Sequence, residues 1–179
     1  MERGGGEVNM LIKEKIGNLK DMEIGSRELD ALSIEWHESN KRILHKTTVA
    51  KREVTLKFLK ENSILLQDDV IYEDESLLIT IDIQPCEVIV IYPVTMYDMA
   101  KLCYEIGNKH LPLFYEEEAV LIPFDAPLFK WLTATGFEPV KQHRKLIHQL
   151  KTTVSSHAHA GNSSSLFSKI LKLTSPAND

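Results

Sequence analysis

The sequence Tyr104-Glu-Ile-Gly-Asn-Lys-His-Leu-Pro112 marks the point where a helical apolar pattern stops. Gly107 ends the pattern, and His110 follows it closely, just before a proline. A polar residue beyond a helix end lies on a loop that rigid structure supports, which is where binding and catalytic groups are usually found. An isolated histidine in such a place is also compatible with a solvated structural residue, so the rest of the chain has to decide its role.

The residues before Gly107 predict an amphipathic helix over residues 94–106. Its apolar positions recur at the i, i+3, i+4 and i+7 spacing of one helix face, and they are Met99, Leu102, Cys103 and Ile106. Thr95 and Asp98 have the spacing of a capping box at the helix start. Gly107 is placed to adopt the left-handed conformation that closes a helix.

Composition excludes several classes of protein. The chain has 179 residues, 43% hydrophobic and 26% charged, which suits one globular domain or two small ones. A net charge of -5 argues against a general nucleic-acid binder, and the longest apolar runs are strand-sized, so we expect no membrane segment. Cys86 and Cys103 lack metal-site spacing and predict free thiols in a reducing compartment, hence a cytoplasmic protein.

Residues 10–75 predict a β-rich, mostly antiparallel N-terminal domain. Leu32, Ile34 and Trp36 alternate with polar residues, which is the period of a half-buried strand. A second alternating run covers residues 54–58. Residues 50–52 before it are a plausible hairpin turn, although the turn signal is weak because it lacks glycine. The boundary to the next domain is expected between residues 74 and 85.

Residues 76–150 predict an α+β domain of ferredoxin-like order. After a strand at 77–83 the pattern gives β-α-β-β-α-β, the split βαβ arrangement. Its expected elements are a buried strand at 87–92, the helix at 94–106, strands at 113–115 and 119–122, a helix capped by Asp125 and ended by Gly136, and a strand at 137–140. The overall fold class is therefore α+β, and residues 151–179, rich in Thr, Ser, Ala and Asn, predict a flexible C-terminal tail.

Histidines supply the chemistry that this sequence offers. His110 lies in the loop, and His157 and His159 form a His-x-His pair in the tail. His143 and His148 lie between the loop and the tail in the sequence. Neutral imidazole is a common nitrogen ligand for nickel, copper and zinc. The chain has no G-x-S-x-G, no P-loop and no G-x-G-x-x-G, so the residues give no support to an enzyme.

The sequence resembles the UreE family, the urease accessory nickel metallochaperones, over roughly residues 10–149. The most specific shared segment is Gly107-Asn-Lys-His-Leu-Pro112, and the others are Trp36-His-Glu-Ser-Asn-Lys-Arg42, Leu66-Gln-Asp-Asp-Val-Ile71 and Gln84-Pro-Cys-Glu-Val88. The resemblance implies a β-rich N-terminal domain that binds peptides or partners, followed by a ferredoxin-like metal-binding domain. It also implies a homodimer in which His110 faces its own copy across a twofold axis.

The function that this resemblance implies is delivery of Ni(II) for assembly of the urease active site. The ion would bind to His110 of both subunits and to His157 or His159, and it would pass to the complex of the urease accessory GTPase with urease apoprotein. Zn(II) or Cu(II) would compete for the same ligands. Two alternatives stay open: a protein-interaction module without metal, and an enzyme with a metal-bound water at His110.

Overall fold

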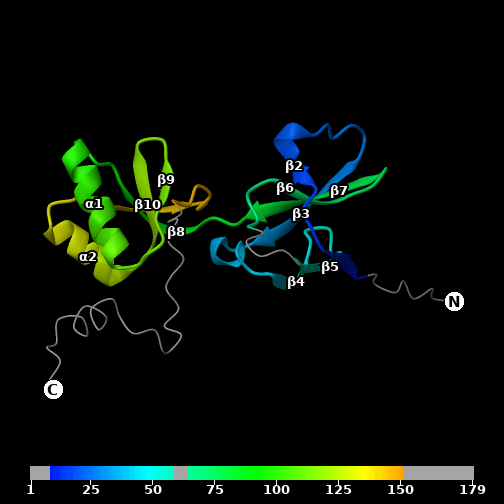
Figure 1. The fold of residues 1–179 in the computed structure, drawn as a ribbon, viewed down its shortest axis with the longest axis horizontal. Helices are drawn as coiled ribbons and strands as arrows, with labels where there is room; N and C mark the ends of the chain where they lie inside the picture. Colours follow the sequence, from blue (N-terminus) through cyan, green and yellow to red (C-terminus); the bar gives the residue numbers. More distant parts are fainter. Residues whose placement is uncertain (1–8, 59–63, 151–179) are drawn as a thin grey trace, which may run out of the picture.

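The computed structural model describes residues 9–58 and 64–150, which contain eleven strands, two α-helices and two short 3-10 helices (Figure 1). In chain order the elements are β1 (Met10–Ile12), β2 (Gly17–Asn18), η1 (Leu19–Asp21), β3 (Glu28–Ile34), η2 (Trp36–Glu38), β4 (Ile43–Thr47), β5 (Glu53–Lys57), β6 (Asp69–Glu73), β7 (Leu77–Ile83), β8 (Cys86–Ile91), α1 (Met96–Asn108), β9 (Phe114–Glu116), β10 (Ala119–Pro123), α2 (Ala126–Ala134) and β11 (Val140–Arg144). The fold class is α+β, as predicted.

Two sheets form the N-terminal part of the chain. One has the strand order β2-β6-β7-β3 and the other β1-β5-β4. The sheets are mixed rather than mostly antiparallel, because β3 pairs with β7 and β1 with β5 in parallel. Parallel partners need a long connection, and here β4, β5 and β6 lie between β3 and β7, which the alternating pattern of single strands does not reveal.

A buried ion pair joins these two sheets at the side of their shared apolar core. Asp30 of β3 is 4% exposed, and its carboxylate accepts from the Arg52 guanidinium at 2.6 Å and from the amide of Ala50 at 3.0 Å. Burial raises the pKa of Asp30, but the hydrogen bonds from Thr48, Arg52 and Ala50 outweigh it and lower the pKa. The hairpin between β4 and β5 is thereby fixed to β3.

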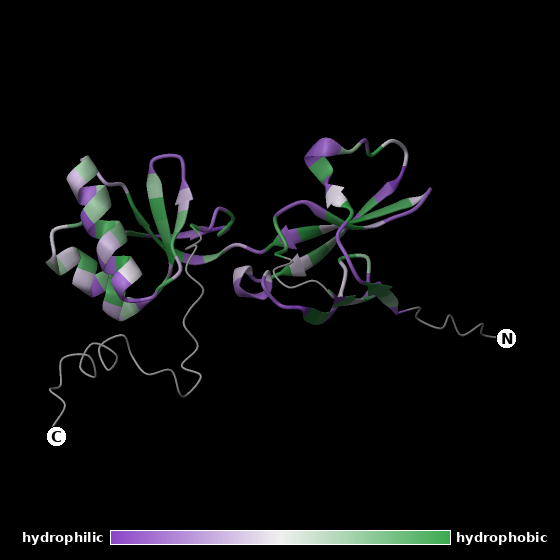
Figure 2. Ribbon diagram, viewed as in Figure 1, coloured by the Kyte–Doolittle hydropathy of each residue, from purple (hydrophilic) through white to green (hydrophobic). Residues whose placement is uncertain are grey.

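The C-terminal part has the element order β8-α1-β9-β10-α2-β11 and a four-stranded antiparallel sheet. Its strand order is β11-β8-β10-β9, so β8 and β10 are central. Side chains of β8 alternate between two apolar clusters, with Ile89 and Ile91 on the helix side and Val88 and Val90 on the other. The prediction of a strand buried on both faces is confirmed, and the central strands β8 and β10 are mostly coloured as hydrophobic in Figure 2.

Both helices begin at the caps that the sequence predicts. The Thr95 hydroxyl accepts from the amide of Asp98, whose carboxylate accepts from the Thr95 amide, and Asp125 accepts from the amide of Leu128 at 2.7 Å. These contacts satisfy amides that have no partner within a helix. Among the residues that the structure covers, no helix has the length and apolar character needed to cross a membrane.

The strand β7 pairs with β3 and β6, so residues 77–83 lie in the N-terminal sheet rather than with the residues that follow. In Figure 1 the chain passes from β7 to β8 as the connection between the two parts. Trp36 lies edge-on against Phe114 with ring centroids 5.6 Å apart, and Lys145 pairs with Asp82 at 2.5 Å. An aromatic contact and an ion pair therefore join the two parts.

Candidate metal site at the end of helix α1

Helix α1 ends in a Schellman motif with His110 in its left-handed position. The amide of His110 donates to the carbonyl of Gly107 at 3.0 Å, and the amide of Leu111 donates to that of Ile106 at 3.3 Å. His110 has a φ of 54°, whereas Gly107 stays within the helix. The prediction that Gly107 adopts the left-handed conformation is wrong, because Leu111 packs with Ile106 in the core and thereby fixes His110 as the turning residue.

Helix α2 ends in the same motif but with a glycine at the turning position. The amide of Gly136 donates to the carbonyl of Thr133 and that of Phe137 to the carbonyl of Leu132, and Gly136 has a φ of 90°. Left-handed backbone costs an L-residue about 1–2 kcal/mol more than glycine. A histidine in this position is therefore held in a conformation that stability alone does not favour, which is common at functional sites.

The residues next to His110 are fixed, while its own ring is exposed. The Lys109 ammonium lies 4.7 Å from the centroid of the Trp131 ring, and Leu111 packs against the core on the other side. The His110 side chain is exposed and makes no hydrogen bond or ion pair to residues within 9–58 and 64–150. Both ring nitrogens are thus open to a ligand from outside this part of the chain.

Two of the other candidate histidines, His143 and His148, lie within the described residues. His143 stands on β11 opposite Glu87 of β8, and the His148 ring lies 5.7 Å from the ring of Tyr115. His157 and His159 lie outside the described residues. Within the part of the chain that the structure describes, no three His, Cys, Asp or Glu side chains lie close enough together to hold a metal ion. As a metal ligand, His110 would therefore need further donors from outside this part of the chain.

The two cysteines are half-buried free thiols, as predicted. Burial raises the pKa of Cys86, and Glu35 adds to the effect, while burial alone raises the pKa of Cys103. This disfavours the thiolate, which is the metal-binding form of cysteine. Cys103 instead contacts a second sulfur atom, the Met99 Sδ at 3.7 Å.

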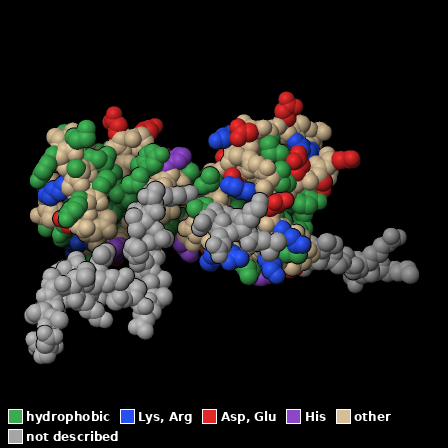
Figure 3. All heavy atoms as spheres, in the orientation of Figure 1, with side chains coloured by type: hydrophobic (Ala, Val, Ile, Leu, Met, Phe, Trp, Pro, Cys, Tyr) green, Lys and Arg blue, Asp and Glu red, His purple; other side chains and the backbone are tan. Residues whose placement is uncertain are grey.

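The outer face of α1 is apolar as well as the inner one. Leu102 and Ile106 are fully buried, yet Met96, Tyr97 and Tyr104 are 87%, 75% and 69% exposed on the opposite side. Val94, just before the helix, is 92% exposed. Hydrophobic side chains are visible over this end of the molecule in Figure 3. A helix that is apolar on two faces indicates that a second surface covers it.

Sequence comparisons assign the chain to a family over most of its length. The sequence model of the family described as UreE urease accessory protein, N-terminal domain, matches residues 12–84. The family model described as UreE urease accessory protein, C-terminal domain, matches residues 86–164. The chain belongs to the UreE family of urease accessory proteins. The two matches meet where β7 ends and β8 begins.

Curated relatives support the assignment. A urease accessory protein UreE of Flavobacterium johnsoniae is 46% identical over 92% of this chain and 99% of its own length. The UreE of Actinobacillus pleuropneumoniae is 43% identical over 79% of this chain and 78% of its own length. The UreE of Acetivibrio thermocellus is 32% identical over 84% of this chain and 98% of its own length. All are named as accessory proteins, so the prediction that this UreE chain is not an enzyme is confirmed.

Proposed function

We propose that this UreE protein is a nickel metallochaperone that supplies Ni(II) during urease maturation. The observation that carries the proposal is His110, an exposed imidazole held in a left-handed turn where glycine would cost less energy. The relatives named above are urease accessory proteins, and urease maturation is the process in which such a protein acts. Nickel is the cargo here, and it has to be both bound and released.

The position of His110 at the end of the apolar outer face of α1 supports a homodimer as part of the proposal. If this face packs on its own copy, the twofold axis places the two His110 residues near each other. Two imidazoles leave a Ni(II) ion short of donors, so we propose His157 or His159 as the further ligands. Zn(II) and Cu(II) use the same nitrogen donors and would compete in vitro.

The proposal includes the partners, the compartment and the domains. We propose that the dimer acts in the cytoplasm and hands nickel to the complex of the urease accessory GTPase with urease apoprotein. We propose a domain boundary at residues 84–85, which the pairing of β7 within the N-terminal sheet supports. The C-terminal domain is assigned as ferredoxin-like, which the antiparallel strand order β11-β8-β10-β9 with two intervening helices supports. Residues 151–179 are its tail.

A Ni(II) titration of the dialysed protein, with the mass measured by light scattering, tests the proposal. We expect a dimer that binds one high-affinity ion per two chains, because a single His110 per chain completes the site only across the twofold axis. The absence of Ni(II) binding by a stable dimer would favour the alternative, an interaction module without metal. One tight ion per chain would place the site elsewhere.

A further inference from the structure

The last turn of α1 carries His110 but is weak in its own right. Gly107 and Asn108 are poor helix formers, and a Cβ added at Gly107 would meet no atom within 4 Å, so no other element packs against this position. The hydrogen bond from the Leu111 amide to the Ile106 carbonyl, which closes the turn, is 3.3 Å long and exceeds the usual range. Such a turn needs support from outside the helix to keep one geometry.

A contact with α2 supplies this support. The residues from Gly107 to His110 are all exposed. Among the hydrogen bonds, ion pairs and cation–π pairs that join described residues, their side chains take part in one, in which the Lys109 ammonium lies 4.7 Å from the centroid of the Trp131 ring. Trp131 packs against the apolar core beneath both helices, and the two helices lie side by side in Figure 1. The ring is thus a fixed platform for the lysine.

Two other lysines of this domain lie over aromatic rings, but neither holds the end of a helix. Lys101 lies 5.5 Å from the centroid of Phe137, and it belongs to the middle of α1, where backbone hydrogen bonds on both sides already fix the chain. Lys141 lies 4.3 Å from the centroid of Phe124 and also pairs with Glu87 at 2.6 Å. The pair at the end of α1 differs from both because it directly precedes the left-handed turn.

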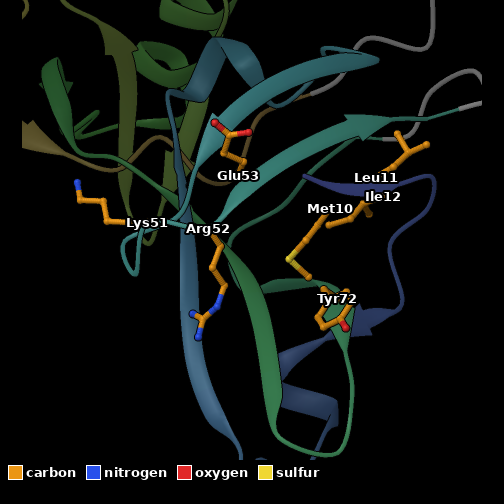
Figure 4. A pocket seen from close by; sticks show the side chains of 7 residues that line it. All are labelled: Met10, Leu11, Ile12, Lys51, Arg52, Glu53 and Tyr72. Carbon is orange, nitrogen blue, oxygen red and sulfur yellow. The ribbon is translucent and has the colours of Figure 1, made fainter. Parts of the chain in front are cut away.

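The groove shown in Figure 4 lies in the N-terminal part of the chain, away from this turn. It encloses about 570 Å³ and is lined by residues of β1, β5 and β6 and of the turn before β5. None of its lining residues belongs to α1 or α2, so it does not fix His110. The position of the imidazole depends instead on the contacts of the turn itself.

Backbone strain and the contact with Trp131 act on the same turn in opposite directions. His110 has a φ of 54°, and left-handed backbone disfavours the turn for an L-residue. A lysine on the face of a tryptophan at an exposed site shifts an equilibrium by about threefold. Because Lys109 directly precedes His110, this shift favours the conformation in which the imidazole is held.

We infer that Trp131 is a positioning residue for the nickel site, acting through Lys109 on the turn that carries His110. The inference rests on the proposed function and adds the side chains that hold its central ligand in place. A ligand that is already held loses less freedom when the ion binds, so the ion binds more tightly. If one ion takes His110 from each of two chains, the contact contributes twice to one site.

Lys109→Met separates positioning from charge in a calorimetric Ni(II) titration. Methionine keeps an unbranched side chain but loses the cation. Removal of a positive charge near Ni(II) would by itself strengthen nickel binding, whereas loss of the contact should weaken it by about tenfold, from about threefold for each of two turns. Lys109→Arg keeps a cation that stacks on aromatic faces and should bind nickel as wild type does. Tighter or equal binding by Lys109→Met would overturn the inference.

Trp131→Leu removes the ring without a change of charge and should also weaken nickel binding by about tenfold. If the ring acts through Lys109, the double variant with Lys109→Met should bind no more weakly than either single variant. Additive losses would mean that Trp131 affects the site by another route, such as core packing, and would overturn the inference. Lys101→Met, at the lysine over Phe137, is the matched control and should keep the wild-type affinity.

Amide hydrogen exchange of the metal-free protein, measured by NMR, tests the contact without nickel. The Leu111 amide should exchange about threefold faster in Lys109→Met and in Trp131→Leu, because the turn opens more often, and at the wild-type rate in Lys101→Met. Unchanged exchange in Lys109→Met would overturn the inference. Wild type that binds no nickel would contradict the proposed function and remove the positioning role with it, and the exchange rates would distinguish that failure from absence of the contact.

Discussion

At the scale of single residues, four non-glycine residues in the described part of the chain adopt left-handed backbone, namely Lys51, Asp68, His110 and Glu117, and His110 is the one to which we assign metal chemistry. His110 closes α1 with a φ of 54°, and Lys51 closes the β4–β5 hairpin with a φ of 66°. Glycine in either place would relieve the backbone. Stability and function can therefore be separated experimentally at His110, because we expect glycine to remove the imidazole without damage to the fold.

His110→Gly should make the protein more stable and abolish its tight nickel binding. We expect the free energy of unfolding to rise by about 1 kcal/mol, since glycine relieves the left-handed strain, and urea unfolding of the metal-free protein measures it. His110→Ala should lose nickel without this gain. A loss of stability in His110→Gly would mean that the imidazole has a structural role.

The opposite substitution can be made at Gly136, which occupies the same left-handed position at the end of α2. Gly136→Ala puts a Cβ on a residue with a φ of 90°, where no atom lies within 4 Å of it, so only the backbone conformation is disfavoured. This control should lose about 1 kcal/mol in the same urea experiment and keep its nickel affinity.

At the scale of elements, some contacts that position a helix or turn join residues close together in the sequence, and others join separate elements. Caps act over three residues, whereas Glu38 of η2 connects its own helix start with the neighbouring strand. Its carboxylate accepts from the amide of Glu35 at 2.9 Å and pairs with Lys46 of β4. Burial raises the pKa of Glu38, but these bonds and the one from Lys41 outweigh it and lower the pKa from 4.5 to about 2.

The low pKa of Glu38 predicts a specific loss of stability in acid. A carboxyl whose pKa is lower in the folded protein stabilises it fully above its unfolded pKa and loses this contribution as pH falls toward the folded value. The stabilisation from Glu38 should therefore disappear between pH 4.5 and about 2. Urea unfolding of Glu38→Gln should show a smaller decrease across this window than wild type. Glu53→Gln, at an exposed carboxylate of β5, should leave the decrease unchanged.

The outer face of α1 is the element on which the proposed dimer depends. Tyr104→Glu should convert the dimer into a monomer, because burial of an unpaired carboxylate in an apolar contact costs several kcal/mol. Analytical ultracentrifugation measures the change. Tyr115→Glu, at a tyrosine of β9 that is 52% exposed, is the control and should remain dimeric. Dimers of Tyr104→Glu at micromolar concentration would show that the subunits associate through another surface.

At the scale of the whole molecule, the described residues hold one exposed histidine of the proposed site and no complete ligand set. His143 lies on β11, and the ring of His148 lies beside that of Tyr115. In the site that we propose, the remaining donors come from a second copy of the chain and from residues 151–179. This requirement connects metal binding with association and with the tail.

Deletion of the chain after Leu150 should weaken nickel binding without abolishing it. The deletion removes His157 and His159 but keeps His110 and the outer face of α1. We expect a dimer that still binds one ion, with an affinity lower by at least about tenfold, as for loss of one ligand contact. Isothermal titration of both proteins gives the comparison, and His157→Ala with His159→Ala in the full chain is the matched variant. Equal affinities would exclude the tail histidines as ligands.

The sequence by itself determined the local features of this protein. Capping residues and short-range periodicity identified α1 and α2, the strand buried on both faces, and the loop that presents His110, because these depend on neighbours within a few residues. The tertiary structure alone decided that β7 pairs with β3 and that the N-terminal sheets are mixed, since partners far apart in the chain leave no local pattern. It also moved the left-handed turn from Gly107 to His110, because the place where Leu111 enters the core, rather than the intrinsic preference of glycine, sets the end of the helix.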